Sequence, residues 1–190
     1  MSKLELQNEA QNLLLQGPVF LHCNASGNHP RAQVVELAVL DTGGQPLVDE
    51  LVRPLAHIRP DASQVHGITD ELVRSAPEWI EVWQNVYQII YNRRLILYDV
   101  PGELGLLRYS CQQARLRWSI DESTVVNLGH LCARHLGEWD SRLENYRIYP
   151  LVEAAARLGL EVEVISHRRA REDAWLARAI LLTIAGWKVV

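Results

Sequence analysis

Apolar residues recur along the chain with two spacings, one typical of strands and one typical of helices. Short runs rich in β-branched and aliphatic residues lie at 19–23, 33–42, 46–54, 94–98 and 124–128. Such runs, bounded by turn residues, predict five strands. The Gly43-Gly44 pair separates the second run from the third, so we expect these two strands to form a hairpin and its continuation.

Longer segments have apolar residues at helical spacing. They lie at residues 1–16, 77–92, 102–118, 129–143, 150–160 and 168–185. A shorter helix is expected to begin with Thr69 as its N-cap, followed by Asp70 and Glu71 in the first turn. Three strands followed by alternating helices and strands predict an α/β fold, with a mixed five-stranded sheet covered by helices on both faces.

Composition limits the class of protein. With 190 residues, 48% of them hydrophobic, the chain is expected to form one domain. We expect residues 1–16 to form a helix that packs on the rest of this domain, residues 17–190. The formal net charge of −4 argues against a protein that binds nucleic acid mainly through charge, but local basic patches stay possible.

The cysteines and the N-terminal segment predict the cellular compartment of the protein. Cys23, Cys111 and Cys132 lie in apolar segments without paired spacing, which predicts reduced core residues in an intracellular protein. The N-terminal segment has neither a basic leader nor a long apolar run, so we expect a cytoplasmic protein with no membrane partner.

Five segments carry a resemblance to a known family. The segment VHGITDELV at 65–73 resembles the hallmark loop and helix of the DEDDh 3′–5′ exonuclease superfamily, proofreading-subunit-like nucleases with a ribonuclease H-like fold. Residues 34–54 resemble the family's second and third strands, 95–108 its second motif, and 168–186 its last helix. Residues 137–151, GEWDSRLENYRIYPL, further resemble a bacterial subgroup. The resemblance implies a ribonuclease H-like exonuclease fold over about residues 18 to 186.

The family's chemistry needs a particular set of side chains. Two divalent metals about 4 Å apart activate a water and stabilise the leaving oxygen, so anionic oxygen ligands are required. The family supplies two acids on the first strand, one on a later helix and one on the last helix, with a histidine as general base. By resemblance these five positions fall on His22, Asn24, Glu103, Asp173 and Arg168, in that order.

Three of the five expected residues are therefore lost, Asp173 is kept, and Glu103 is a conservative change from Asp. His22 and Asn24 supply no negative charge, which leaves Glu103 and Asp173 as weak metal candidates. Arg168 is expected to neutralise these two carboxylates. We expect a vestigial pocket with no cofactor and without normal two-metal nuclease activity.

The first hypothesis is a nuclease-dead exonuclease fold that serves as a binding or regulatory module. Its partner would be the end of a single-stranded nucleic acid or another protein, and a homodimer is possible. For a strand end, the expected contacts are His66 in the VHGIT loop and Arg168, Arg169 and Arg171 on the phosphates.

Two other hypotheses stay open. In one, the chain is an active exonuclease that uses Mg²⁺ or Mn²⁺ bound by relocated carboxylates, namely Glu36, Asp99, Glu103 and Asp173. In the other, His22, Cys23 and His167 form a transition-metal site or activate a thiol. Strand alternation argues against the latter, because it sends Cys23 to the opposite face from His22.

Overall fold

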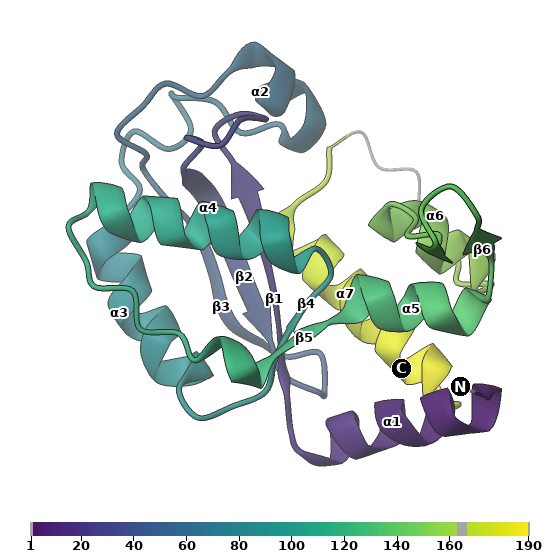
Figure 1. Cartoon of the computed structure of the whole chain (residues 1–190). Helices are drawn as coiled ribbons and strands as arrows, with labels where there is room; N and C mark the ends of the chain where they lie inside the picture. The colour runs from purple at the N-terminus through teal and green to yellow at the C-terminus, as the bar shows by residue number, and fades with distance from the viewer. Residues whose placement is uncertain (1, 163–166, 190) are drawn as a thin grey trace.

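The computed structural model describes residues 2–162 and 167–189, in which a five-stranded sheet lies between two layers of helices (Figure 1). The strands of this sheet are β1 (Val19–Ala25), β2 (Val34–Leu40), β3 (Pro46–Leu51), β4 (Leu95–Leu97) and β5 (Val125–Asn127). The helices are α1 (Lys3–Leu15), α2 (Pro60–His66), α3 (Trp79–Ile90), α4 (Val100–Gln113), α5 (Leu128–Leu136), α6 (Leu151–Arg157) and α7 (Ala170–Ile184). A 3-10 turn (Glu122–Thr124) and a hairpin of β6 (Trp139–Asp140) and β7 (Asn145–Tyr146) complete the elements.

The sheet has the order β3-β2-β1-β4-β5 and is mixed. β2 pairs antiparallel with both β1 and β3, whereas β4 is parallel to β1 and β5 is parallel to β4. This is the mixed five-stranded sheet that the sequence predicts, and the α/β, ribonuclease H-like fold class is confirmed.

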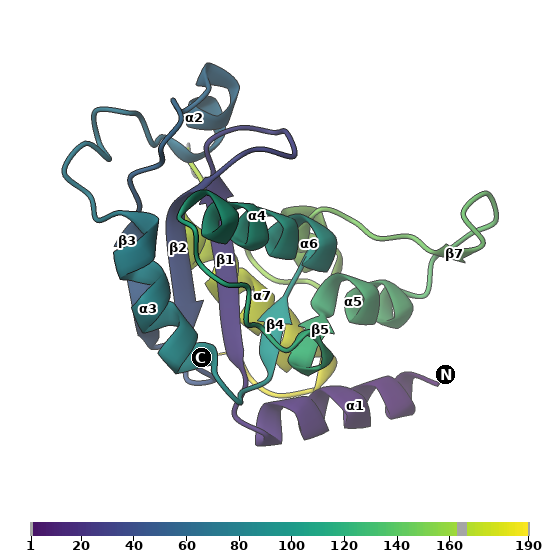
Figure 2. The same ribbon diagram turned by 60° about the vertical axis from the view of Figure 1, so that its left-hand side comes forward.

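The two faces of the sheet are covered by different helices (Figure 2). Helices α3 and α4 pack on one face, where Leu21 and Cys23 of β1 join a core that includes Trp79 and Trp83. On the other face Phe20 joins the residues of α1, α5, α6 and α7. Alternate residues of β1 thus point to opposite cores, as the period of a strand requires.

Three predicted helices differ from those observed. No helix begins at Thr69. The short helix is α2, which begins at Pro60 and ends before Gly67, a residue with φ of 72°. The helix expected over 129–143 ends at Gly137, also left-handed, and the following residues form the β6–β7 hairpin. The helix expected to reach residue 118 ends at Gln113.

Helix α1 packs on the helical layer through three buried residues. Ser2 caps it with a capping box formed with Glu5, which satisfies its first amide groups. Leu6, Ala10 and Leu14 lie in the same core as α5, α6 and α7. Within the described residues, no helix is long and apolar enough to span a bilayer.

Candidate functional site

The residues at the five positions implied by the resemblance lie close together at one end of the sheet. His22 and Asn24 come from β1, Glu103 from the first turn of α4, and Asp173 from the first turn of α7. Arg168 lies two residues before α7 and donates its backbone N–H to Val65, in the segment 65–73 that carries the hallmark motif. The fold thus brings the positions together, whatever residues occupy them.

The ring of His22 lies between two carboxylates. Its Nδ1 is 3.6 Å from Oε1 of Glu103, and its Nε2 is 3.2 Å from Oδ2 of Asp173. Burial disfavours the charged ring, but the charges of Glu103 and Asp173 and the hydrogen bond to Asp173 outweigh it and raise the pKa of His22 to about 10. The two carboxylates thus favour the charged ring over the neutral one.

The carboxylate of Glu103 has no other partner among the described residues. Both of its oxygens are buried, and neither accepts a hydrogen bond from a described residue. Burial of an uncompensated carboxylate is costly. His22 is the described side chain that lies close enough to offset the charge of Glu103.

Asp173 is compensated from two sides. His22 faces one oxygen, and the guanidinium of Arg168 donates a hydrogen bond to the other. Burial acts to raise the pKa of Asp173, but His22 and Arg168 lower it below its ordinary value of 3.8. Arg168 therefore neutralises Asp173, as expected from the sequence, whereas Glu103 pairs with His22 instead.

A second group of polar contacts surrounds the buried carboxylate of Glu36, which lies opposite Asn24 on β2. Asn24 donates its side-chain N–H to Glu36 at 2.8 Å and to the carbonyl of Arg168 at 3.1 Å. Arg169 donates to Glu36 through Nε at 2.7 Å and through a second nitrogen, and the backbone N–H of Ala170 donates at 2.8 Å. Glu36 therefore joins β2 to the start of α7.

The sequence did not reveal this second group. The sequence suggests Glu36 as a relocated metal ligand and Arg169 as a phosphate contact, but the two residues bind each other. The available signal was the antiparallel register, which places Asn24 opposite Glu36. No spacing rule connects Glu36 to Arg169, because they lie 133 positions apart.

The other predicted contacts for a nucleic-acid strand are also engaged within the protein. His66 is 3% exposed, and its ring bonds to the carbonyl of Ala25 and the N–H of Ile68. Burial lowers the pKa of His66, so its ring is neutral at pH 7. The guanidinium of Arg171 lies 3.5 Å from the carboxylate of Asp49. Binding of a strand by His66, Arg168, Arg169 or Arg171 stays a prediction that needs these contacts to rearrange.

The structure also separates the residues of the histidine and cysteine hypothesis. Cys23 points into the core with α3 and α4, away from His22, as the strand period predicts. His167 lies against Gly67, where an added Cβ would be 2.8 Å from its ring. In residues 2–162 and 167–189 no cluster of three or more His, Cys, Asp or Glu side chains could hold a metal ion.

The donor set does not fit a pair of divalent cations. The family's metals need several carboxylate oxygens free to bind them. Here Glu103 and Asp173 face the His22 ring, and Arg168 binds the remaining side of Asp173. Asn24 turns its N–H, a donor, toward two acceptors, so this part of its side chain cannot coordinate a cation.

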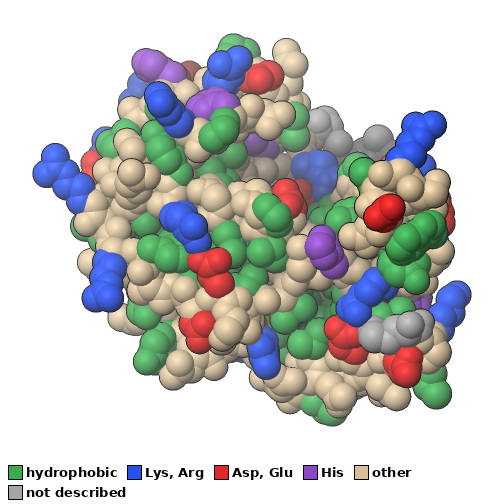
Figure 3. Space-filling view, in the orientation of Figure 1, with side chains coloured by type: hydrophobic (Ala, Val, Ile, Leu, Met, Phe, Trp, Pro, Cys, Tyr) green, Lys and Arg blue, Asp and Glu red, His purple; other side chains and the backbone are tan. Residues whose placement is uncertain are grey.

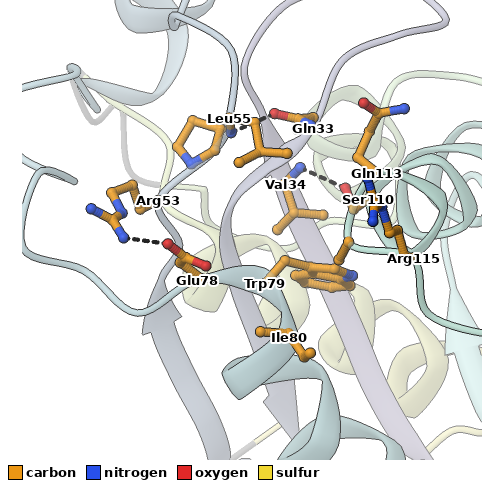
Figure 4. Close-up of a pocket in the computed structure, with 12 residues that line it drawn as sticks. Gln33, Val34, Arg53, Leu55, Glu78, Trp79, Ile80, Ser110, Gln113 and Arg115 are labelled. Atoms are coloured by element: carbon orange, nitrogen blue, oxygen red, sulfur yellow. Dashed lines mark hydrogen bonds and ion pairs between the residues drawn. The ribbon is translucent and has the colours of Figure 1, made fainter.

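The surface is hollowed between α4 and the side of the molecule formed by α5 and α6, and charged side chains of both signs lie along this hollow (Figure 3). A separate cavity of about 250 Å³ lies near the far end of α4 (Figure 4). Trp79, Val34 and Leu55 supply its apolar wall, and Arg115 and the Arg53–Glu78 pair lie at its edge. It contains none of the residues of the candidate site.

Comparison with known proteins gives relatives in sequence. The chain is 27% identical over 168 residues to an uncharacterized exonuclease, CP81, of Escherichia phage 186, which covers 86% of each protein. It is 27% identical over 137 residues to the DNA polymerase III subunit epsilon of Pasteurella multocida, covering 71% of this chain and 51% of that subunit. The chain thus spans most of the phage protein but about half of the polymerase subunit. No family model matches the chain.

Comparison with solved structures identifies exonucleases that share the fold of this chain. The nuclease domain of 3′hExo, a DEDDh family member bound to rAMP, superposes with a TM-score of 0.68 at 16% identity, covering 88% of this chain and 91% of that one. Exonuclease X in complex with 5′ overhanging duplex DNA superposes with a TM-score of 0.62 at 20% identity, covering 90% and 94%. The chain is therefore related in sequence to exonucleases and has the ribonuclease H-like fold of the DEDDh 3′–5′ exonuclease superfamily.

Proposed function

We propose that this protein binds the end of a single nucleic-acid strand without cutting it by two-metal hydrolysis. The observation that carries the proposal is the position of His22, whose two ring nitrogens face Glu103 and Asp173. A cation fixed between these carboxylates opposes the entry of Mg²⁺ or Mn²⁺ by charge repulsion and by occupying the oxygens that would bind the metal.

The surroundings of the site favour a nucleic-acid ligand. The loop after β1 has exposed His29 and Arg31, and Arg59 at the start of α2 donates its backbone N–H to Ser26 in the same loop. Basic and histidine side chains gather over α2 in the space-filling view (Figure 3). Unlike Arg168 and Arg169, Arg31 has no acidic partner among the described residues, so it is available for a phosphate. Since few cations are available, we expect weak binding that is detectable at low salt and falls only modestly as the salt concentration rises.

The hypothesis of relocated carboxylates is less well supported by the geometry. Glu36 is 2% exposed and already accepts hydrogen bonds from Asn24, Arg169 and Ala170. Asp99 caps α4 by accepting from the N–H of Gly102 at 3.3 Å. Both carboxylates are thus already engaged by other groups of the protein. Because one relative is named an exonuclease, the experiment below also tests this alternative.

The test measures binding and cutting on the same strand. We expect a fluorescent single-stranded DNA or RNA of about 20 nucleotides to show increased anisotropy with micromolar protein at low salt, and to keep its length in Mg²⁺ or Mn²⁺. Arg31→Gln should weaken binding several-fold, whereas Arg142→Gln, an exposed charge on the β6–β7 hairpin, is the matched control. Metal-dependent shortening that Asp173→Ala abolishes would establish the active alternative. Absence of binding at low salt would overturn the proposal and favour a protein as the partner. Whether the chain forms a homodimer is a separate prediction, which light scattering tests.

A further inference from the structure

The candidate site joins three separate elements through charge. Glu103 belongs to α4, Asp173 to α7 and His22 to β1, and the His22 ring is the described group that lies between the two carboxylates. We infer that His22, assisted by Arg168, is a built-in cation that holds β1, α4 and α7 together in place of a divalent metal. This inference concerns the site for which we propose the loss of two-metal chemistry, and it rests on that proposal.

The position of the ring between two buried carboxylates favours its cationic form. A neutral imidazole has one N–H and one acceptor nitrogen, so it can donate to one carboxylate only. Here Nε2 lies 3.2 Å from Asp173, within hydrogen-bonding distance, and Nδ1 lies 3.6 Å from Glu103, close enough for attraction between charges but too far for a hydrogen bond. Only the doubly protonated ring presents an N–H to both sides.

The charges around the site balance without a metal. Glu36, Glu103 and Asp173 are 2%, 6% and 7% exposed, so their charges are poorly screened by water. Three basic side chains oppose these charges: Arg169 faces Glu36, His22 faces Glu103 and Asp173, and Arg168 binds Asp173. A divalent cation would add positive charge to a site that is already neutral, so little electrostatic energy would favour its binding.

The arrangement leads to a specific expectation for His22→Asp. This substitution removes the cation and places a third carboxylate beside Glu103 and Asp173, on the strand between them. Because like charges at this separation repel strongly in a buried site, the three carboxylates need a cation from solution. Their oxygens are then the ligands that Mn²⁺ and Mg²⁺ prefer.

The experiment compares thermal unfolding of three full-length proteins in EDTA and in millimolar MnCl₂. We expect the wild type to have the same Tm in both, within about 1 °C. We expect His22→Asp to melt about 5 to 10 °C lower than the wild type in EDTA, as for a broken buried ion pair, and to regain at least half of that loss in Mn²⁺. His22→Asn is the matched control, because it also removes the cation but adds no charge; it should melt lower in EDTA and gain little from Mn²⁺.

Several outcomes would overturn the inference. A wild type that gains as much Tm from Mn²⁺ as His22→Asp would show that the native site already takes a metal. A His22→Asp protein as stable as the wild type in EDTA would show that the ring holds nothing together. If His22→Asp does not fold in either buffer, the ¹⁵N NMR signals of the wild-type ring decide: two protonated nitrogens at pH 7 support the inference, and one bare nitrogen overturns it.

The inference and the proposed function fail separately. Strand binding is measured by anisotropy on the wild type in EDTA, where no metal contributes. Loss of that binding with unchanged melting results would overturn the proposed ligand and leave the role of His22 standing. If the wild type binds the strand and Mn²⁺ also raises its Tm, the role of His22 is overturned and the proposed ligand stands.

Discussion

The side-chain amide of Asn24 donates a hydrogen bond of 2.8 Å to the carboxylate of Glu36, its antiparallel partner on β2. Both residues are almost fully buried, at 8% and 2% exposed. The same amide group reaches the carbonyl of Arg168, so one side chain connects β1, β2 and the segment that leads into α7. An acid at this position, which the resemblance implies for an active exonuclease, would face Glu36 instead of bonding to it.

Asn24→Asp therefore tests whether the site depends on a donor at this position. The substitution keeps the size of the side chain, removes the N–H and adds a negative charge beside Glu36. We expect the free energy of unfolding to fall by about 2 to 4 kcal/mol, measured by urea denaturation at pH 7. Asn28→Asp makes the same chemical change at an exposed position and should alter stability by less than about 0.5 kcal/mol. Equal effects at the two positions would mean that the Asn24 hydrogen bonds contribute nothing.

Gly67 offers a test of the contact between the VHGIT loop and the segment before α7. It has φ of 72°, and a Cβ at this position would lie 2.8 Å from the ring of His167. Gly67→Ala therefore adds a steric clash to the backbone strain, whereas Gly137→Ala, at φ of 75° with no atom within 4 Å, adds the strain alone. We expect a loss of about 1 kcal/mol at Gly137 and about 2 to 3 kcal/mol at Gly67, measured by urea denaturation. Similar losses would show that His167 moves away without cost.

Much of the fold could be predicted because the strands are marked locally. The β-branched runs and the Gly43-Gly44 turn predict β1, β2 and β3, and Pro101 marks the start of α4 within two residues. Two of the three helices that differ from the prediction end at glycines. Gly67 and Gly137 adopt left-handed conformations that end α2 and α5, and residue identity alone does not reveal that a glycine will do so.

The candidate site was predictable in position but not in its pairing. The resemblance places His22, Glu103 and Asp173 correctly in one pocket, because the fold fixes those positions. The fixed charge of Arg168 suggests that it neutralises both carboxylates, whereas in the structure Arg168 binds Asp173 and His22 pairs with Glu103. Such pairings depend on distances between side chains that are far apart in sequence, for which one sequence contains no local signal.

The three cysteines should be inert toward thiol reagents while the protein is folded. All three are buried and free. Burial raises the pKa of Cys23 well above 9.0, that of Cys111 to about 11 and that of Cys132 to about 12, so almost no thiolate forms at pH 8. We expect Ellman's reagent to modify the cysteines at pH 8 in urea only. Rapid modification of one cysteine in the native protein would contradict this prediction, and mass spectrometry would identify which.

The pH dependence of stability should report the charge on His22. Burial disfavours the charged ring, but Glu103 and Asp173 raise its pKa from the ordinary 6.5 to about 10. A group whose pKa is raised by folding stabilises the protein fully below its unfolded pKa, and this contribution disappears as pH rises through its folded pKa. We therefore expect the free energy of unfolding to fall by about 3 to 5 kcal/mol between pH 6.5 and pH 10, measured by urea denaturation. His22→Gln keeps the other groups that titrate in this range, so its curve should be flatter than that of the wild type, and parallel curves would show that the ring is neutral in the folded protein.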